Sequence, residues 1–125
     1  MHKQPGNQLS LLGEDLQAVR MDLSGAVSHD SGGTDLFQRV GGPAIYSRKV
    51  MLNLSKCHYV NSGGVAWLLI HHRRFQEGGG KLILHSASPV VRQIFSLMKM
   101  ELVLNFCHDA QEAERLLNDA PLKGG

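Results

Sequence analysis

Ser62 is the residue whose surroundings most favour chemistry at a side chain. It lies in Val60-Asn61-Ser62-Gly63-Gly64-Val65, directly after an apolar run and directly before a stretch with helical spacing. A serine at a helix start has its hydroxyl near solvent, and the glycines after it leave the helix entrance bare of side chains. Two interpretations follow: an N-cap at Ser62, or a phosphorylation site on a docking surface. A phosphate adds about −2 charge, which a helix N-terminus tolerates but burial against a partner opposes.

The other candidate residues lack the spacing that catalysis or metal binding needs. The chain has no GxSxG elbow, no HExxH pair and no phosphate loop of the GxxxxGK[ST] type. Gly78-Gly79-Gly80 follows a helical stretch and precedes an apolar run, which is the order of a helix stop. The histidines are scattered, and the acidic residues, Asp22 among them, are expected to be solvated. We therefore expect no metal, no cofactor and no enzymatic activity.

Composition indicates a soluble globular protein of one domain. The chain has 125 residues, of which 42% are hydrophobic and 19% charged. A net charge of +2 does not favour nucleic acid, and the basic run His71-His72-Arg73-Arg74 is expected to be a solvated helix face. Cys57 and Cys107 belong to no CxxC pair. With no signal peptide and no apolar run of about 20 residues, we expect a cytoplasmic protein without membrane insertion.

The N-terminal third has the weakest pattern. Residues 1–8 are polar and expected to be flexible. Two apolar patches between residues 9 and 23 are candidate strands, and alternation favours a strand at 16–23 with a turn at Ser24-Gly25. Residues 28–33 are expected to form a loop, and a short helix is predicted to begin at 34–39 and to stop at Gly41-Gly42-Pro43.

From residue 50 onward, strand and helix signals alternate. Strands are predicted at 50–54, 81–85 and 102–104, and helices at 62–77, from Ser88-Pro89 to 98, and at 109–117. The expected helix caps are Ser62, Ser88 and Asp109. The first of these helices is expected to bury Val65, Leu68 and Leu69, with Trp67 partly outward or at the sheet edge, as core filler or as a binding anchor. This order predicts an α/β sheet with parallel crossovers.

Residues 50–117 resemble the STAS domain family, typified by bacterial anti-sigma factor antagonists. The resemblance is carried by the junction VMLNLSKCHYVNSGGVAWLL, by the glycine stop and strand in GGGKLILHSASPVVRQIF, and by the last strand and helix. In that family the strand commonly ends in an acidic residue, then Ser, a small residue, Gly and an aliphatic residue. The matching positions here are Asn61, Ser62, Gly63, Gly64 and Val65. More loosely, Asp22-Leu23-Ser24-Gly25 resembles the family's early strand and turn.

The resemblance implies a fold and a function. The fold is α/β and STAS-like, a four- to five-stranded mixed sheet with helices packed mainly on one face. It forms a single domain at 9–120 between flexible segments at 1–8 and 121–125. The implied function is that of a bacterial anti-anti-sigma factor in transcription regulation. It binds an anti-sigma factor that is a serine kinase of the histidine-kinase-like ATPase type, and phosphorylation of Ser62 breaks the complex. The implied docking face is Asn61, Ser62, Gly63, Gly64 and Val65.

The sequence departs from the family pattern at three positions. Asn61 and Asn53 stand where the family commonly has acidic residues, and Gly63 lacks a hydroxyl often found there. Asparagine keeps the size and hydrogen bonding of aspartate without its charge. If the carboxylates position the serine or a metal ion of the kinase, phosphorylation is slow or absent. The alternatives are therefore a non-phosphorylated STAS scaffold, a ligand-sensing module, a subunit of a lipid-transport complex, or an enzyme with an unrecognised site.

Overall fold

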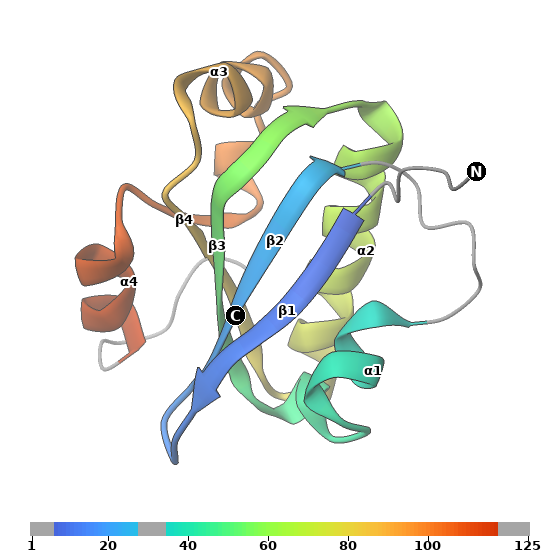
Figure 1. The fold of residues 1–125 in the computed structure, drawn as a ribbon, viewed down its shortest axis with the longest axis vertical. Coiled ribbons are helices and arrows are strands. Elements are labelled where there is room, and N and C mark those ends of the chain that lie inside the picture. The colour runs from blue at the N-terminus through green and yellow to red at the C-terminus, as the bar shows by residue number, and fades with distance from the viewer. Residues whose placement is uncertain (1–6, 28–34, 118–125) are drawn as a thin grey trace, which may run out of the picture.

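Five strands form one mixed sheet in the order β1-β2-β3-β4-β5, flanked by helices (Figure 1). The structure is a computed structural model that describes residues 7–27 and 35–117. The strands are β1 (Asn7–Glu14), β2 (Val19–Val27), β3 (Lys49–Val60), β4 (Lys81–His85) and β5 (Asn105–Cys107). β1 and β2 are antiparallel, and the other neighbours are parallel. The helices are α1 (Leu36–Gly41), α2 (Ser62–Gly78), α3 (Pro89–Leu97) and α4 (Ala110–Leu117), with single 3-10 turns at Ile45–Ser47 and Met100–Leu102. The predicted α/β fold with a mixed sheet is confirmed.

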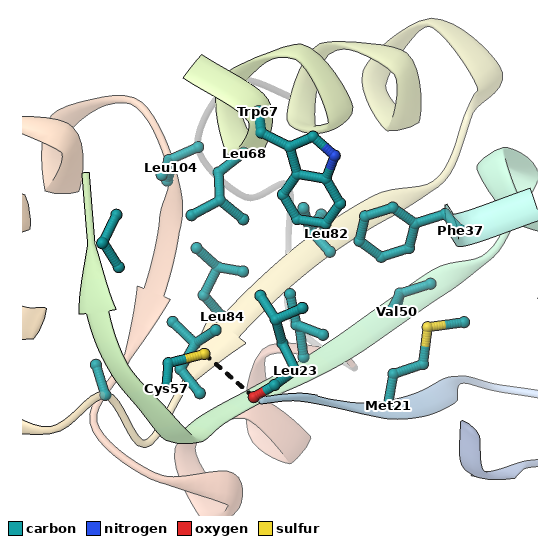
Figure 2. Packing of buried hydrophobic residues seen from close by; sticks show 14 of the residues in the cluster. Met21, Leu23, Phe37, Val50, Cys57, Trp67, Leu68, Leu82, Leu84 and Leu104 are labelled. Atoms are coloured by element: carbon teal, nitrogen blue, oxygen red, sulfur yellow. Dashed lines mark hydrogen bonds between the residues drawn. The ribbon is translucent and has the colours of Figure 1, made fainter. Parts of the chain in front are cut away.

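The two faces of the sheet carry cores of different size. Met21, Leu52 and Leu84 are aligned on β2, β3 and β4 and are fully buried in the larger core, which α1, α2 and α3 also enter. Figure 2 shows part of this core, with Trp67 and Leu68 of α2 packed over the strands. Because side chains alternate along a strand, the intervening residues face the other way. On that side Met51, Ile83 and Cys107 pack with Ala113 and Leu117 of α4 and with Ala18, which precedes β2, in a smaller core.

The predicted strand at 16–23 is displaced in the structure. Leu16 is fully exposed between β1 and β2, and β2 continues through the predicted turn at Ser24-Gly25 to Val27. That turn prediction is wrong because Gly25, at φ +89°, lies beside a register shift between β2 and β3. At this shift Gly25 and Ala26 are aligned with Cys57 and Tyr59, so the extra residue is on β3 and β2 continues through the glycine.

The ends of the predicted domain fall partly outside the described residues. The predicted flexible segment 1–8 overlaps β1 at Asn7 and Gln8. Its first six residues, the loop predicted at 28–33 and the segment 121–125 lie outside the described part of the chain. The predicted short helix before Gly42 is present as α1, with Gly42 as its C-cap at φ +95°.

Gly78, Gly79 and Gly80 end α2 as predicted, and a different constraint acts at each. Gly79 is the C-cap in the left-handed region at φ +88°, which favours glycine. A Cβ on Gly78 would lie 2.5 Å from the carbonyl oxygen of Tyr46, and one on Gly80 would overlap the carbonyl oxygen of Arg48. The end of α2 thus packs directly on the backbone that leads into β3.

The helix starts after β4 and β5 are also as predicted. The Ser88 hydroxyl accepts a hydrogen bond from the Val91 N–H over 3.3 Å, with Pro89 as the first helical residue. The Asp109 carboxylate accepts from the Glu112 N–H over 2.9 Å. Both signals act within three residues, so distant parts of the chain do not change them.

The strand predicted at 102–104 is wrong. Leu102 ends the 3-10 turn with 70% of its surface exposed, and the strand beside β4 begins three residues later at Asn105. Lys99 precedes this turn at φ +57°, where the chain reverses after α3. After this reversal, pairing with β4 begins at Asn105, which is aligned with Ile83. The reversal leaves Leu102 and Val103 at the surface.

The buried part of α2 is wider than its sequence predicted. Trp67, His71 and His72 are each only 4% exposed, so the outward placement of Trp67 and the solvated-face prediction for both histidines are wrong. Trp67 is core filler, and Leu69, predicted to be buried, is half-buried. Phe37 of α1 stacks on Trp67 with ring centroids 5.6 Å apart, and the Tyr46 hydroxyl lies 2.9 Å from His71 Nδ1. Segments distant in sequence therefore cover a helix face that looked polar. Arg73 and Arg74 are exposed, as predicted.

Candidate functional site

β3 ends at Val60 and α2 begins at Ser62, with Asn61 between them. The backbone of Asn61 is extended, and its side-chain oxygen accepts a hydrogen bond from the Gly64 N–H over 2.8 Å. Asn61 is therefore the N-cap, and the prediction that Ser62 caps the helix is wrong. The strand predicted at 50–54 continues in the structure to Val60, so Asn61 is the one residue left between strand and helix. Asparagine caps as well as serine, and Asn61 makes the bond. Ser62 becomes the first residue of the helix.

The five predicted site residues differ in accessibility. Ser62 is exposed, while Asn61 and Gly63 are half-buried. Gly64 is buried, and Val65 is 3% exposed in the larger core. The junction is thus anchored from inside by Val65 and presents the Ser62 side chain outward. Because the first N–H groups of a helix lack partners within it, the positive end of the α2 dipole lies beside this hydroxyl.

A polar row crosses the sheet at Asn53. Asn53 is aligned with Asp22 on β2 and with His85 on β4. The Asn53 side-chain amide donates to one Asp22 oxygen over 2.8 Å, and the Lys56 ammonium donates to the other over 2.9 Å. Asp22 is 6% exposed, which corrects the expectation that it is solvated. The signal that sequence reasoning missed is a lone Asp within the alternating apolar residues of β2.

The two titratable side chains of this row, Asp22 and His85, both have pKa values below their usual values. Burial acts to raise the pKa of Asp22, but hydrogen bonds from Lys56 and Asn53 outweigh it, so the pKa lies below its usual value. Burial lowers the pKa of His85, although Asp109, Asp22 and Glu114 oppose this shift. Asp22 is therefore ionised at neutral pH, and a carboxylate adjoins the position of Asn53 from the neighbouring strand.

The two thiols are buried, and burial raises their pKa values. Burial raises the pKa of Cys57 to about 12 and that of Cys107 to about 11. Cys57 Sγ lies 3.1 Å from the carbonyl oxygen of Leu23, as Figure 2 shows. Both cysteines are free and remain protonated near neutral pH, which disfavours nucleophilic chemistry.

Within residues 7–27 and 35–117, no cluster of His, Cys, Asp and Glu has the arrangement of a metal site. In the same part of the chain, no helix combines the length and apolar character needed to cross a bilayer.

Comparison with known proteins agrees with the fold and the junction. The family model of the STAS domain matches residues 16–113, from the turn before β2 into α4, and includes Asn61, Ser62 and Gly63. The chain belongs to the STAS domain family. The family resemblance predicted from the sequence is therefore confirmed.

A solved STAS-like structure is similar to this chain over nearly its whole length. It is that of the anti-sigma factor antagonist SpoIIAA in its unphosphorylated form. The likeness has a TM-score of 0.61 at 17% sequence identity and covers 91% of this chain and 100% of the other. At this identity the comparison establishes a shared fold.

Proposed function

We propose that this STAS domain is an anti-sigma factor antagonist that works as a protein-interaction switch and not as an enzyme. In its unphosphorylated form it binds a kinase-like anti-sigma factor in the bacterial cytoplasm, and phosphorylation of Ser62 ends the binding. The observation that carries the proposal is the exposed Ser62 at the first position of α2, in the place where the STAS family commonly has its serine.

The geometry at the junction supports a switch that leaves the domain folded. A phosphate on Ser62 would sit at the positive end of the α2 dipole and in solvent, so the fold tolerates it. The same phosphate would have to lose water if a partner covered the junction, and that cost favours dissociation. Asn61 cannot accept a proton as a carboxylate can, so in this chain the residue before Ser62 does not take the Ser62 proton.

A second candidate is a docking domain that is not phosphorylated. Asn61 supports it, because this residue makes the helix cap without placing a charge beside Ser62. In this candidate the chain is a STAS scaffold, a ligand-sensing module or a subunit of a lipid-transport complex.

Intact-mass analysis separates the two candidates. The chain and its Ser62→Ala variant are each incubated with ATP and a purified kinase-like anti-sigma factor from the same genome. A gain of one phosphate that is absent in the variant supports the switch. Binding to this partner without a mass gain supports a constitutive docking domain. If the chain neither gains a phosphate nor binds, the anti-sigma assignment is contradicted and the scaffold or transport candidate is supported.

A further inference from the structure

The exposed side of α2 continues away from Ser62 as a partly apolar stripe. Ser62, Ala66, Ile70 and Arg73 follow one another at helical spacing, and all are exposed, with Leu69 half-buried beside them. Ile70 exposes 51% of its surface, although α2 has a full buried face elsewhere. The stripe is therefore surface that none of the described helices and strands covers.

Two shallow hollows lie on either side of this stripe. One, of about 440 Å³, is lined by Ala66, Leu69, Ile70, Arg73, Arg74 and Glu77. The other, of about 230 Å³, is lined by Leu69, His72, Arg73, Gln76, Leu102 and Val103. Leu69 and Arg73 belong to both, so the hollows form one continuous surface. Leu102 and Val103 are 70% and 43% exposed and extend its apolar area beyond α2.

The second hollow is lined by a positively charged side chain, Arg73, and by a histidine, His72, whose ring has a nitrogen without a described hydrogen-bond partner. No described carboxylate forms an ion pair with Arg73, whereas its neighbour Arg74 is paired with Asp35 over 2.8 Å. Burial lowers the pKa of His72, and the nearby charges of Lys81 and Arg73 lower it further. Among the described residues, His72 Nδ1 is buried without a hydrogen-bond partner. A carboxylate from a partner would meet a positive field here.

We propose that this surface, defined by Ala66, Leu69, Ile70, Arg73, Leu102 and Val103, docks the anti-sigma partner through an apolar segment flanked by a carboxylate. The inference rests on the proposed function and adds where and by what chemistry the partner is held. The apolar side chains would fill the hollows beside Leu69 and Leu102, and the carboxylate would pair with Arg73.

The dimensions agree with a single interface that also covers Ser62. At about 1.5 Å per residue, Arg73 lies about 16 Å along α2 from Ser62. A standard interface covers about 800 Å² on each partner, which is a patch about 30 Å across. A partner seated on Ser62 therefore reaches the hollows without a second contact area, and the apolar part supplies binding energy that the small polar junction lacks.

The test is calorimetric titration of the chain with the purified kinase-like anti-sigma factor from the same genome. Arg73→Glu and Leu102→Asp alter the surface at exposed positions, and we expect each to raise Kd at least tenfold. The matched controls are Arg115→Glu, on α4, and Leu16→Asp, between β1 and β2; both residues are exposed, and we expect Kd within twofold of the unmodified chain. Thermal unfolding of each variant verifies that it folds.

Amide chemical shifts provide a second measurement on the unmodified chain. On titration with the same partner, the N–H signals of Leu69, Arg73, Leu102 and Val103 should shift together with that of Ser62. If the partner binds but these signals stay fixed, and the four variants bind alike, the docking surface is overturned while the proposed function stands. If the unmodified chain does not bind the partner, both are overturned. A homodimer that Leu102→Asp converts to a monomer would assign the surface to a second copy and overturn the proposal.

Discussion

The side-chain oxygen of Asn61 accepts a hydrogen bond from the Gly64 N–H over 2.8 Å. The bond fixes the first turn of α2 with a neutral group and leaves Ser62, the next residue, on the outside of that turn. The junction thus separates two tasks. Asn61 holds the helix end, and within the described part of the chain the exposed Ser62 hydroxyl makes no hydrogen bond that a modification would break.

Replacing Asn61 with alanine should lower the free energy of unfolding by about 1 kcal/mol, because an N–H at the α2 N-terminus loses its acceptor. Ser62→Ala, at the exposed neighbouring position, should change it by less than about 0.5 kcal/mol. Urea unfolding followed by the fluorescence of Trp67, which is buried and the only tryptophan of the chain, measures both. Equal losses in the two variants would contradict the assignment of the cap.

Asn61→Asp should keep the cap and add the charge that the family commonly has before its serine. If the proposed switch is correct, the initial rate of phosphate transfer to Ser62 should rise above that of the unmodified chain, since a carboxylate can orient the hydroxyl and accept its proton. Timed intact-mass measurements with the kinase-like partner and ATP give the rate. An unchanged rate would show that the partner alone supplies this function.

Leu68→Ala should cost about 2–5 kcal/mol of unfolding free energy, because Leu68 is completely buried between α2 and the sheet. The matched variant Ile70→Ala removes an exposed aliphatic side chain two residues further along the helix and should cost less than about 0.5 kcal/mol. The comparison uses the same urea titration. A near-neutral Leu68→Ala would contradict the orientation of α2 on the sheet.

The ion pair of Asp22 and Lys56 predicts a loss of stability in acid. The pKa of Asp22 is lower in the folded chain than its usual value, so its contribution is present above about pH 4 and is lost as pH falls through the folded pKa. Lys56→Met should reduce the drop in unfolding free energy between pH 7 and pH 3. Lys99→Met, at another exposed lysine, should leave that drop unchanged, and equal drops in both would contradict the role of Lys56.

His72 predicts a second loss of stability at mildly acidic pH. Burial, with Lys81 and Arg73 nearby, holds the pKa of His72 below its usual value. The unfolded chain therefore binds a proton first, and stability declines as pH falls below about 6.5. His72→Gln should flatten the change in unfolding free energy between pH 7.5 and pH 5, whereas His58→Gln, at an exposed position, should not. An unaltered slope in His72→Gln would contradict this account.

Much of the fold was predictable because its signals are local. Ser88 and Asp109 cap helices through hydrogen bonds that span three residues, and the glycine run at 78–80 ends α2 by its backbone conformation. The strand at 81–85 agrees with the predicted bounds. The position of Ser62 beside a strand end was also evident, because the apolar run, the serine and the glycines are contiguous.

Only the tertiary structure decided which polar residues are buried and where the chain turns into β5. His71 is buried because Tyr46, 25 positions away, and Phe37 of α1 cover it, and Asp22 is buried through its pairing with Asn53, 31 positions away. No local pattern encodes such contacts, since their energy appears only when distant segments meet. The amino-acid sequence thus determined the family, the order of the central elements and the candidate serine, while packing determined that Asp22 is a buried ion and that Leu102 faces solvent.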